Sequence, residues 1–452
     1  MRVSLTTLLI AIAAGCDLVQ PLPESESGVR TVEVSVFEGG YGIEWHLRMA
    51  ESFNVIHADE EMRVELWGDP RNADILKPRL LRGDPPDLIL NERLPIWQLV
   101  QADKLVSFND ALAQPSVGDS TAATWGEAFA PGMLDMYASD GEVWAIPAAY
   151  GAWLCWYNAA LFRKHEWEVP DTWDALTALS EKMKAAGVAP WTLQGKYANF
   201  YAWNTYVSLV HRVGGLSAIN RINALERNAF SHPDAVEAAR QFQVFAADFL
   251  QSGALSMTHT ESQLQFVNDQ AAIIFCGTWL ENEMKESFPP GFELRAFPIP
   301  RVVGGTGNPR LLHGQGMEFL FVPKDARHPD VAFEFARYLV SPENAPDMAR
   351  SIGVISPLAG ATPRDAVSPA LASVLDVLEQ SESIYNVRVR LLFPEWTSQV
   401  LTGAITDLLR GDLSPEEFGR ALDDGIAASV AREDRPIPPF MPYDPAQFGE
   451  GS

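Results

Sequence analysis

Three things are missing from this chain of 452 residues. It has only three cysteines, so it lacks the material for a dense disulfide framework or a cysteine-based zinc site. After residue 15 it has no apolar run long enough to span a bilayer. The local motifs of P-loop NTPases, serine hydrolases, zinc proteases and dithiol redox enzymes do not occur. We therefore expect no cofactor and no metal site.

Positive charge is scarce as well. There are 34 Lys and Arg residues against 59 Asp and Glu residues, which gives a formal net charge of −25. A surface of this sign repels phosphate backbones, so we expect no nucleic-acid partner. Hydrophobic residues are plentiful at 47%, and the length favours two compact units. The 13 tryptophans suit either bulky cores or a surface that stacks on a flat apolar ligand.

The first residues, MRVSLTTLLIAIAAGC, combine an early arginine, a short apolar run and small residues, which is typical of an export signal. Ala13-Ala14-Gly15-Cys16 is similar to the lipobox of bacterial lipoproteins, although Ala13 stands where leucine is usual. We assign residues 1–16 to a signal peptide with Cys16 as the candidate lipidation site. Residues 17–29 then form a flexible tether. Secretion without a lipid anchor is the alternative.

The two remaining cysteines, Cys155 and Cys276, lie on apolar segments. An oxidising compartment would allow them to form a disulfide, and two buried free thiols are the other interpretation. The sequence does not decide between them, because it does not show whether their Cα atoms lie close enough.

Strand and helix patterns alternate from residue 30 onward. Residues 30–37 alternate valine with polar residues, as a half-covered strand does, and residues 62–68 return to strand character. The helical pattern between them predicts one apolar face made of Trp45, Leu47, Met49, Phe53 and Ile56. Alternating elements of this kind predict an α/β sheet with helices on its faces.

Two later helices have clear start signals. Asp171 or Thr172 can cap the helix predicted over residues 170–186. Ser414 is followed by Pro415 at the first helical position and by Glu417 three residues after the cap. The chain then ends in a Pro-rich tail over residues 436–452.

Several segments, in order, resemble the bacterial extracellular solute-binding proteins of the sugar-binding type, the family of maltose-binding protein. The most specific is VWAIPAAYGAWLCWYNAALFRKHEWEVPDTWDAL, which is similar to a family stretch of strand-Pro, Tyr-Asn, Leu-Phe and Pro-x-Thr-Trp. FVNDQAAIIFCGTWLEN is similar to the family's apolar strand followed by Gly-x-Trp. FVPKDARHPDVAFEFARYLVSPENA, GVISPL and LLRGDLSPEEFGRAL match later family segments.

This resemblance implies two α/β lobes joined by hinge strands, with a solute held in the cleft between them. Lobe 1 would comprise residues 30–146 and about 316–370, and lobe 2 residues 147–315 and about 371–435. It further implies a monomer that is not an enzyme. Such a protein is exported to the periplasm or cell surface and touches the membrane only through a lipid on Cys16. It delivers a neutral sugar or oligosaccharide to the membrane permease subunits of an ABC importer.

A sugar offers an apolar C–H face and a rim of hydroxyls, so its site needs aromatic rings and polar acceptors. By the resemblance and by position after strands, the candidate contacts near strand ends are Glu38, Gly40, Tyr41, Asn91 and Glu92. The candidate rings are Tyr150, Trp153, Trp203, Trp279 and Trp396. Further candidates are Glu281, Gln315, Glu318 and Glu395. For each ring the competing interpretation is an ordinary core residue, above all for Trp203 on its helix.

Two other functions fit the same residues. The first is an exported glycoside hydrolase, because two of the glutamates Glu38, Glu281, Glu318 and Glu395 could form a catalytic pair. The second is a binding protein for a polyamine or a metal chelate, which the acidic composition allows.

Overall fold

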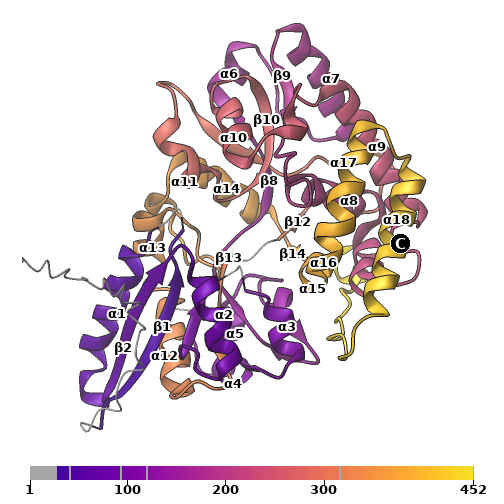
Figure 1. The fold of residues 1–452 in the computed structure, drawn as a ribbon. Helices are drawn as coiled ribbons and strands as arrows, with labels where there is room; N and C mark the ends of the chain where they lie inside the picture. Colours follow the sequence, from indigo (N-terminus) through magenta and orange to yellow (C-terminus); the bar gives the residue numbers. More distant parts are fainter. Residues whose placement is uncertain (1–27, 40–41, 92–93, 119–120, 315–316, 451–452) are drawn as a thin grey trace, which may run out of the picture.

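The computed structural model describes residues 28–39, 42–91, 94–118, 121–314 and 317–450. The predicted signal peptide with Cys16, and nearly all of the tether, lie outside the described residues, as do the candidate site residues Gly40, Tyr41, Glu92 and Gln315. Two main sheets organise the described chain, and both carry helices, as the α/β pattern predicts (Figure 1).

The first sheet has six strands, and β1 lies inside it with parallel neighbours on both sides. All three valines of β1 are completely buried. β13 runs antiparallel to β3, β4 and β7. The strands in spatial order are β2 (Met62–Asp69), β1 (Arg30–Phe37), β3 (Leu88–Leu90), β13 (Met317–Pro323) and β4 (Leu105–Val106), with β7 (Ile146–Ala149) also paired to β13.

The second sheet has four strands, and its central strand β10 is buried along its whole length. The strands in spatial order are β11 (Leu294–Phe297), β8 (Trp153–Asn158), β10 (Ala271–Gly277) and β9 (Ala189–Thr192). Two small ribbons complete the strands, β5 (Ala138–Ser139) with β6 (Glu142–Val143), and β12 (Leu311–His313) with β14 (Ser383–Tyr385).

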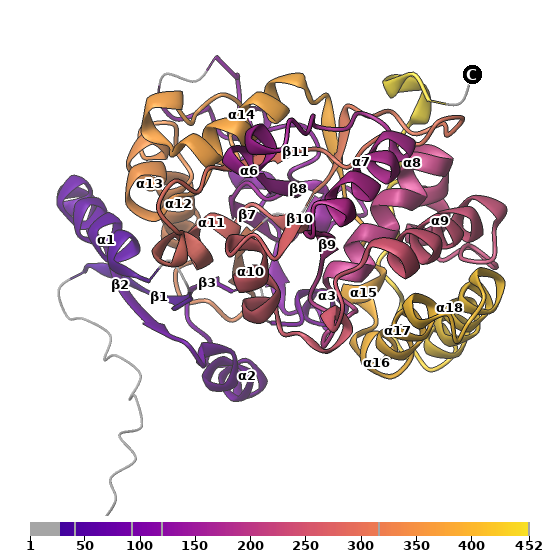
Figure 2. The same cartoon turned by 90° about the horizontal axis from the view of Figure 1, so that it is seen from above.

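We call the elements built on the six-stranded sheet the first unit and those built on the four-stranded sheet the second unit. The helices of the first unit are α1 (Glu44–Ile56), α2 (Asn72–Arg82), α3 (Ile96–Gln101), α4 (Asn109–Leu112), α5 (Trp125–Ala128), α12 (Pro329–Leu339) and α13 (Ala345–Ile352). Those of the second unit are α6 (Ala159–Lys164), α7 (Trp173–Ala185), α8 (Tyr201–Asn223), α9 (Pro233–Phe249), α10 (His259–Val267), α11 (Leu280–Met284), α14 (Pro369–Gln380), α15 (Val389–Leu392), α16 (Pro394–Trp396), α17 (Thr402–Arg410) and α18 (Pro415–Val430). Figure 2 shows the helices α8, α9, α17 and α18 gathered on one side of the second unit.

The chain passes between the units where β7 gives way to β8. Ala149 still pairs with Met317 in the first sheet, whereas Trp153 pairs with Gly277 in the second. The chain thus leaves the first sheet three residues after the boundary at residue 146 that the sequence suggests. Beside this crossing, Gly314 on the way from β12 to β13 forms a bridge with Ala152.

Local sequence signals account for the helix starts. Thr172 accepts a hydrogen bond from the Ala175 amide at 3.1 Å and so caps α7. Ser414 forms the predicted capping box with Glu417 at the start of α18. Each cap satisfies an amide that has no partner within its helix.

The predicted apolar face of α1 is only partly right. Trp45, Met49 and Phe53 are buried, but Leu47 is 37% and Ile56 61% exposed. A spacing of four residues keeps side chains on one face, whereas two residues turn the chain about 200° around the helix axis. Leu47 therefore points away from the face that Trp45 occupies.

Cys155 and Cys276 are buried free thiols, which answers the question that the sequence left open. In the β8–β10 pair, Cys155 lies opposite Phe275 and Cys276 lies opposite Leu154. A register difference of one residue sends the two side chains to opposite faces of the sheet, so they do not meet. Within the described part of the chain, no helix has the length and apolarity to cross a membrane.

Candidate functional site

Polar residues gather at one edge of the first sheet, where β1 and β3 end and β13 begins. Glu38 follows β1 directly and is partly exposed. Asn91 follows β3, and its amide donates a hydrogen bond to the Phe319 carbonyl at 3.1 Å. Glu318 precedes Phe319 on the same strand. We call Glu38, Asn91 and Glu318 the first-sheet edge. The carboxyl ends of parallel strands are the common place for ligand contacts in open α/β sheets.

Glu318 has an unusual backbone for its position. Its φ of 54° lies in the left-handed region, although the residue is not glycine and sits within a strand. A backbone of this kind costs on the order of 1–3 kcal/mol and is most often found at functional sites. The side chain is only 11% exposed, and its Oε2 lies 3.8 Å from His46 Nε2.

His46 is a titratable neighbour of Glu318 and was not predicted from the sequence. It lies in the first turn of α1, is 1% exposed, and burial lowers its pKa to about 4. The ring is therefore neutral at pH 7. Its Nδ1 has no hydrogen-bond partner among the described residues. No pattern of residue types marks this histidine, because only the approach of β13 to α1 places it beside a carboxylate.

A buried chain of hydrogen bonds holds Asn91 in place at the first-sheet edge. The Asn91 side-chain amide donates to Asn72 Oδ1 at 2.5 Å, and Asn72 at the start of α2 donates to Ser35 Oγ at 3.5 Å. All three side chains are completely buried. Asn91 is thus fixed in place, and as a polar group in a dry environment it is strongly oriented.

The aromatic counterpart lies on the second unit. Trp153 at the start of β8, Phe200 before α8 and Trp279 before α11 contact one another, and we call these three rings the aromatic platform. Trp279 stacks on Phe200 with ring centroids 5.8 Å apart and planes 14° apart. Trp153 meets Trp279 edge to face at 5.2 Å and Phe200 at 5.1 Å. Trp153 is 1% exposed, whereas Phe200 and Trp279 are partly exposed.

Gly277 explains how Trp279 is held. A Cβ at this position would lie 1.9 Å from the Trp279 ring, so only glycine leaves room for the indole over the turn. The Gly-x-Trp spacing that the sequence shows therefore has a steric cause. It places the indole against the end of β10 rather than in the core behind the sheet.

The short crossing brings the two groups of residues together. Only Tyr150, Gly151 and Ala152 separate Ala149 in the first sheet from Trp153 in the platform. Four Cα steps span at most about 14 Å, so the end of β7 and the start of the platform are near neighbours. The turn after β10 is tied to this crossing, because Thr278 Oγ1 donates to the Tyr150 carbonyl at 3.3 Å.

Sequence reasoning missed Phe200 and selected Trp203 instead. Trp203 is 1% exposed and packs against Phe230 and Trp396 inside the second unit. Phe200 directly precedes α8, so the N-terminal end of this helix lies at the platform. The Arg390 guanidinium lies 5.2 Å above the Phe200 ring, and this contact was not predicted either. No side-chain cap marks the start of α8, so no local signal in the sequence indicated Phe200.

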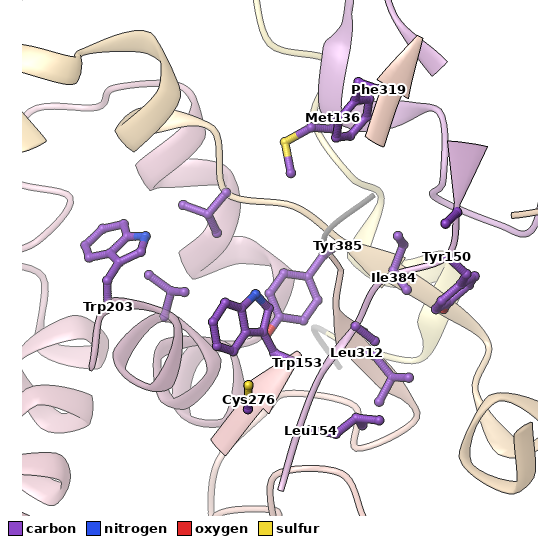
Figure 3. Close-up of a cluster of buried hydrophobic side chains, with 14 of the residues drawn as sticks. Met136, Tyr150, Trp153, Leu154, Trp203, Cys276, Leu312, Phe319, Ile384 and Tyr385 are labelled. Carbon is purple, nitrogen blue, oxygen red and sulfur yellow. The ribbon is translucent and has the colours of Figure 1, made fainter. Parts of the chain in front are cut away.

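Several predicted rings turn out to be core residues. Trp396 is 1% exposed, and its indole N–H donates to the Leu422 carbonyl at 3.3 Å. Tyr150 is 6% exposed and lines a separate hollow of about 300 Å³ with Ile355 and Leu378. Figure 3 shows Tyr150, Trp153 and Trp203 as members of one buried cluster. Of the five predicted rings, Trp279 alone presents appreciable surface.

Two predicted carboxylates, Glu281 and Glu395, are not part of the first-sheet edge. Glu281 accepts a hydrogen bond from Ser368 Oγ at 2.5 Å, and burial raises its pKa. It therefore bonds to the N-cap residue of α14. Glu395 is exposed at the start of α16. We find no short contact that pairs two of the four predicted glutamates in the described chain.

Comparisons with known proteins give a consistent result. The sequence profile described as bacterial extracellular solute-binding protein matches residues 57–346. The diacetylchitobiose binding protein NgcE of Streptomyces coelicolor is 25% identical over 413 residues, which cover 89% of this chain and 86% of that protein.

Solved structures show the same fold. A chitin oligosaccharide binding protein has a TM-score of 0.70 and 18% identity, with coverage of 89% of this chain and 99% of the other. The sugar-binding protein MalE of Xanthomonas citri has a TM-score of 0.68 and 18% identity, with coverage of 89% and 98%. The two-lobed fold that the sequence suggested is thereby confirmed.

Proposed function

Because this chain belongs to the family of bacterial extracellular solute-binding proteins, we propose that it captures a neutral sugar or oligosaccharide between its two units. The bound solute is then delivered to the membrane permease subunits of an ABC importer. Membership of this family also makes it an exported protein. The division into lobe 1 (residues 30–146 and about 316–370) and lobe 2 (residues 147–315 and about 371–435) is part of this proposal.

The observation that carries the proposal is the partly exposed Trp279 at the end of β10. It is backed by Phe200 and Trp153, so its indole is rigid and loses little freedom when a ligand stacks on it. Across the crossing, Glu38 and Glu318 supply carboxylates. Rings for the C–H face and acceptors for the hydroxyl rim are what a sugar requires.

We propose chitin-derived oligosaccharides as the first ligands to test. The relative from S. coelicolor is named for diacetylchitobiose, and the structural neighbour is named for chitin oligosaccharides. We retain Glu38, Gly40, Tyr41, Glu92, Trp279, Gln315 and Glu318 as proposed contacts. Asn91 is left out, because it is completely buried and its side-chain amide donates to Asn72. Tyr150, Trp153, Trp203 and Trp396 are left out, because their rings are buried.

Binding would follow a shift between an open and a closed arrangement of the units. A solute that touches both the aromatic platform and the first-sheet edge is bound best when the units approach each other, so it favours the closed form. The protein would act as a monomer, tethered to the membrane by a lipid on Cys16. No covalent step is involved.

The test is a thermal unfolding series of the purified protein with diacetylchitobiose, longer chitin oligosaccharides, maltose and raffinose. A ligand at 100 times its dissociation constant stabilises the folded state by about 2.7 kcal/mol, which raises the unfolding midpoint measurably. The sugars are recovered afterwards and analysed by chromatography, and we expect them unchanged. Shorter sugars in the recovered sample would indicate a glycoside hydrolase. A shift with spermidine and with none of the sugars would overturn the sugar proposal.

A further inference from the structure

The C-terminal segment is fastened to both units. After α18 ends at Val430, residues 436–450, here called the strap, run as an irregular chain with one short turn at Pro445–Phe448. Figure 2 shows the yellow end of this segment beside α8. The sequence suggested only a Pro-rich tail. Its contacts show a well-anchored element instead.

Two hydrogen bonds join the strap to the first unit. Gln101 Nε2, at the end of α3, donates to the Pro436 carbonyl at 3.4 Å. Ser139 Oγ, in β5, donates to the Pro439 carbonyl at 3.0 Å. Both donors belong to the stretch of chain between β3 and β7, which are strands of the six-stranded sheet.

Arg388 connects the strap to both units at once. Its guanidinium lies 5.4 Å from the Trp97 ring of α3 and 5.2 Å from the Phe440 ring of the strap. It donates from Nη1 to the Pro439 carbonyl at 3.3 Å and from Nη2 to the Asn223 carbonyl of α8 at 3.3 Å. Arg388 as a whole residue is only 5% exposed, so these contacts are shielded from solvent.

The far end of the strap is held by α8. Asn220 forms two hydrogen bonds with the Tyr443 backbone, at 2.8 and 3.0 Å. Glu450 is 5% exposed and accepts from the Asn308 amide at 2.6 Å, while His211 Nε2 lies 3.0 Å from the same carboxylate.

Glu450 also supplies a hydrogen-bond acceptor at the point where α8 is interrupted. Gly215 has a φ of 62° and a ψ of −166°, which interrupts the helix and leaves the next amide without a helical acceptor. The Leu216 amide donates to Glu450 Oε2 instead. A carboxylate at the start of a helical segment is further favoured by the helix dipole.

The strap is stiff because of its composition. Five of its 15 residues are proline, at positions 436, 438, 439, 442 and 445. Proline fixes φ, and Pro-rich segments behave as semi-rigid spacers rather than flexible coils. A stiff segment that is fixed at both ends transmits a displacement of one end to the other.

We propose that the strap restrains the movement of the first unit relative to the second, with Arg388 as its central fastening point. Separation of the units on this side requires the Gln101 and Ser139 bonds to break, because the far end is held by α8. If the proposed sugar-binding function is correct, the strap also sets how much free energy closure costs and so tunes the affinity for solute.

The test measures the distance between the units in the absence of solute. Leu81 of α2 is 87% exposed and Val244 of α9 is 58% exposed, so L81C and V244C accept a pair of fluorophores in a C16S background. Cys155 and Cys276 stay unlabelled, because both are buried and burial raises the pKa of each thiol. The distribution of distances is then recorded by single-molecule energy transfer.

The key variant is Gln101→Ala with Ser139→Ala, which removes both side-chain hydrogen bonds from the first unit to the strap and leaves the Arg388 contacts and the attachment to α8 intact. We expect the width of the distance distribution to grow at least 1.5-fold. The control is Gln251→Ala with Ser398→Ala, which removes two side-chain hydrogen bonds inside the second unit and should leave the width unchanged.

An unchanged distribution in the key variant overturns the proposal, and so does an equal broadening in the control. Asn220→Ala with Glu450→Ala removes the side-chain anchors at the other end and provides a second, independent release, and we expect broadening there too. Since no solute is present, the result does not depend on the proposed function. A broadened distribution in a protein that binds no sugar would support the strap and contradict the sugar proposal.

Discussion

At the scale of single residues, tryptophans on similar apolar segments differ in the surface that they keep. Trp153, Trp203, Trp279 and Trp396 are the same residue type on apolar segments, yet only Trp279 keeps a partly exposed ring. Gly277 is the reason, because the space above its Cα is filled by the indole. The position of Trp279 was predictable from the Gly-x-Trp spacing, whereas the burial of the other three was not.

Replacement of Trp279 by alanine should weaken binding of the solute by about 1–3 kcal/mol, as the loss of a stacking ring does in other aromatic sites. Isothermal titration calorimetry of the wild-type and variant proteins with the same sugar measures this change. Phe288→Ala is the matched control, because that ring packs on Phe292 and is no part of the platform. An unchanged dissociation constant for Trp279→Ala would remove the residue from the site.

The role of Gly277 can be separated from that of the indole by a double-mutant cycle. Gly277→Ala should displace the Trp279 ring and weaken binding on its own. When Trp279 is already alanine, the same change should have little further effect, since residues that act together are non-additive. Additive losses would mean that Gly277 affects binding by another route.

At the scale of elements, helix starts and strands were the most predictable features. The capping signals of α7 and α18 depend on residues within one turn, so the sequence contains all the information needed. The error on the face of α1 was one of spacing. Leu47 lies two residues from both Trp45 and Met49, so it falls outside the face that Trp45, Met49 and Phe53 share.

The capping box of α18 gives a prediction at this scale. Ser414→Ala removes the acceptor for the Glu417 amide and should lower the free energy of unfolding by about 1 kcal/mol. Urea unfolding should show a lower midpoint with an unchanged slope. Ser398→Ala, which removes a side-chain bond to the Glu395 carbonyl outside any cap, should cost clearly less. Equal losses in the two variants would contradict the role of the cap.

At the scale of the whole molecule, several ionisable groups lie in the interior where no sequence pattern places them. Burial lowers the pKa of His46 and His211 to about 4 each and that of His313 to about 3. The rings of His211 and His313 both stack on the Tyr385 ring, with ring centroids 4.3 and 5.4 Å from the Tyr385 centroid. The residues come from α8, β12 and β14, so the cluster exists only in the assembled fold.

These histidines predict a pH dependence of stability. Unfolding exposes them to water, where the pKa of histidine returns to about 6.5, so between pH 6.5 and about 4 the unfolded chain binds protons that the folded chain does not. The stabilisation is complete above pH 6.5 and is lost as the pH falls through this window. The slope should approach roughly 4 kcal/mol per pH unit near pH 5 if all three contribute.

Urea unfolding at pH 7, 6 and 5 measures this slope. His46→Gln should reduce it by about one third, since one of three titrating groups is gone. Gln251→Ala is the control, because it removes a side chain that does not titrate, and it should leave the slope unchanged. A midpoint that does not change from pH 7 to pH 5 would show that these histidines are protonated in the folded state.

The sequence by itself determined the alternation of strands and helices, the caps of α7 and α18, the family resemblance and the position of Trp279 after Gly277, because each depends on residues that are close together in the chain. The tertiary structure alone decided which rings are buried, that Phe200 supports Trp279, and that Cys155 and Cys276 lie on opposite faces of a sheet. It also decided that the tail is a strap. These features arise where distant segments meet, as Trp203 of α8 meets Trp396 of α16. Burial is a property of such meetings and not of a residue type, so no local pattern specifies it.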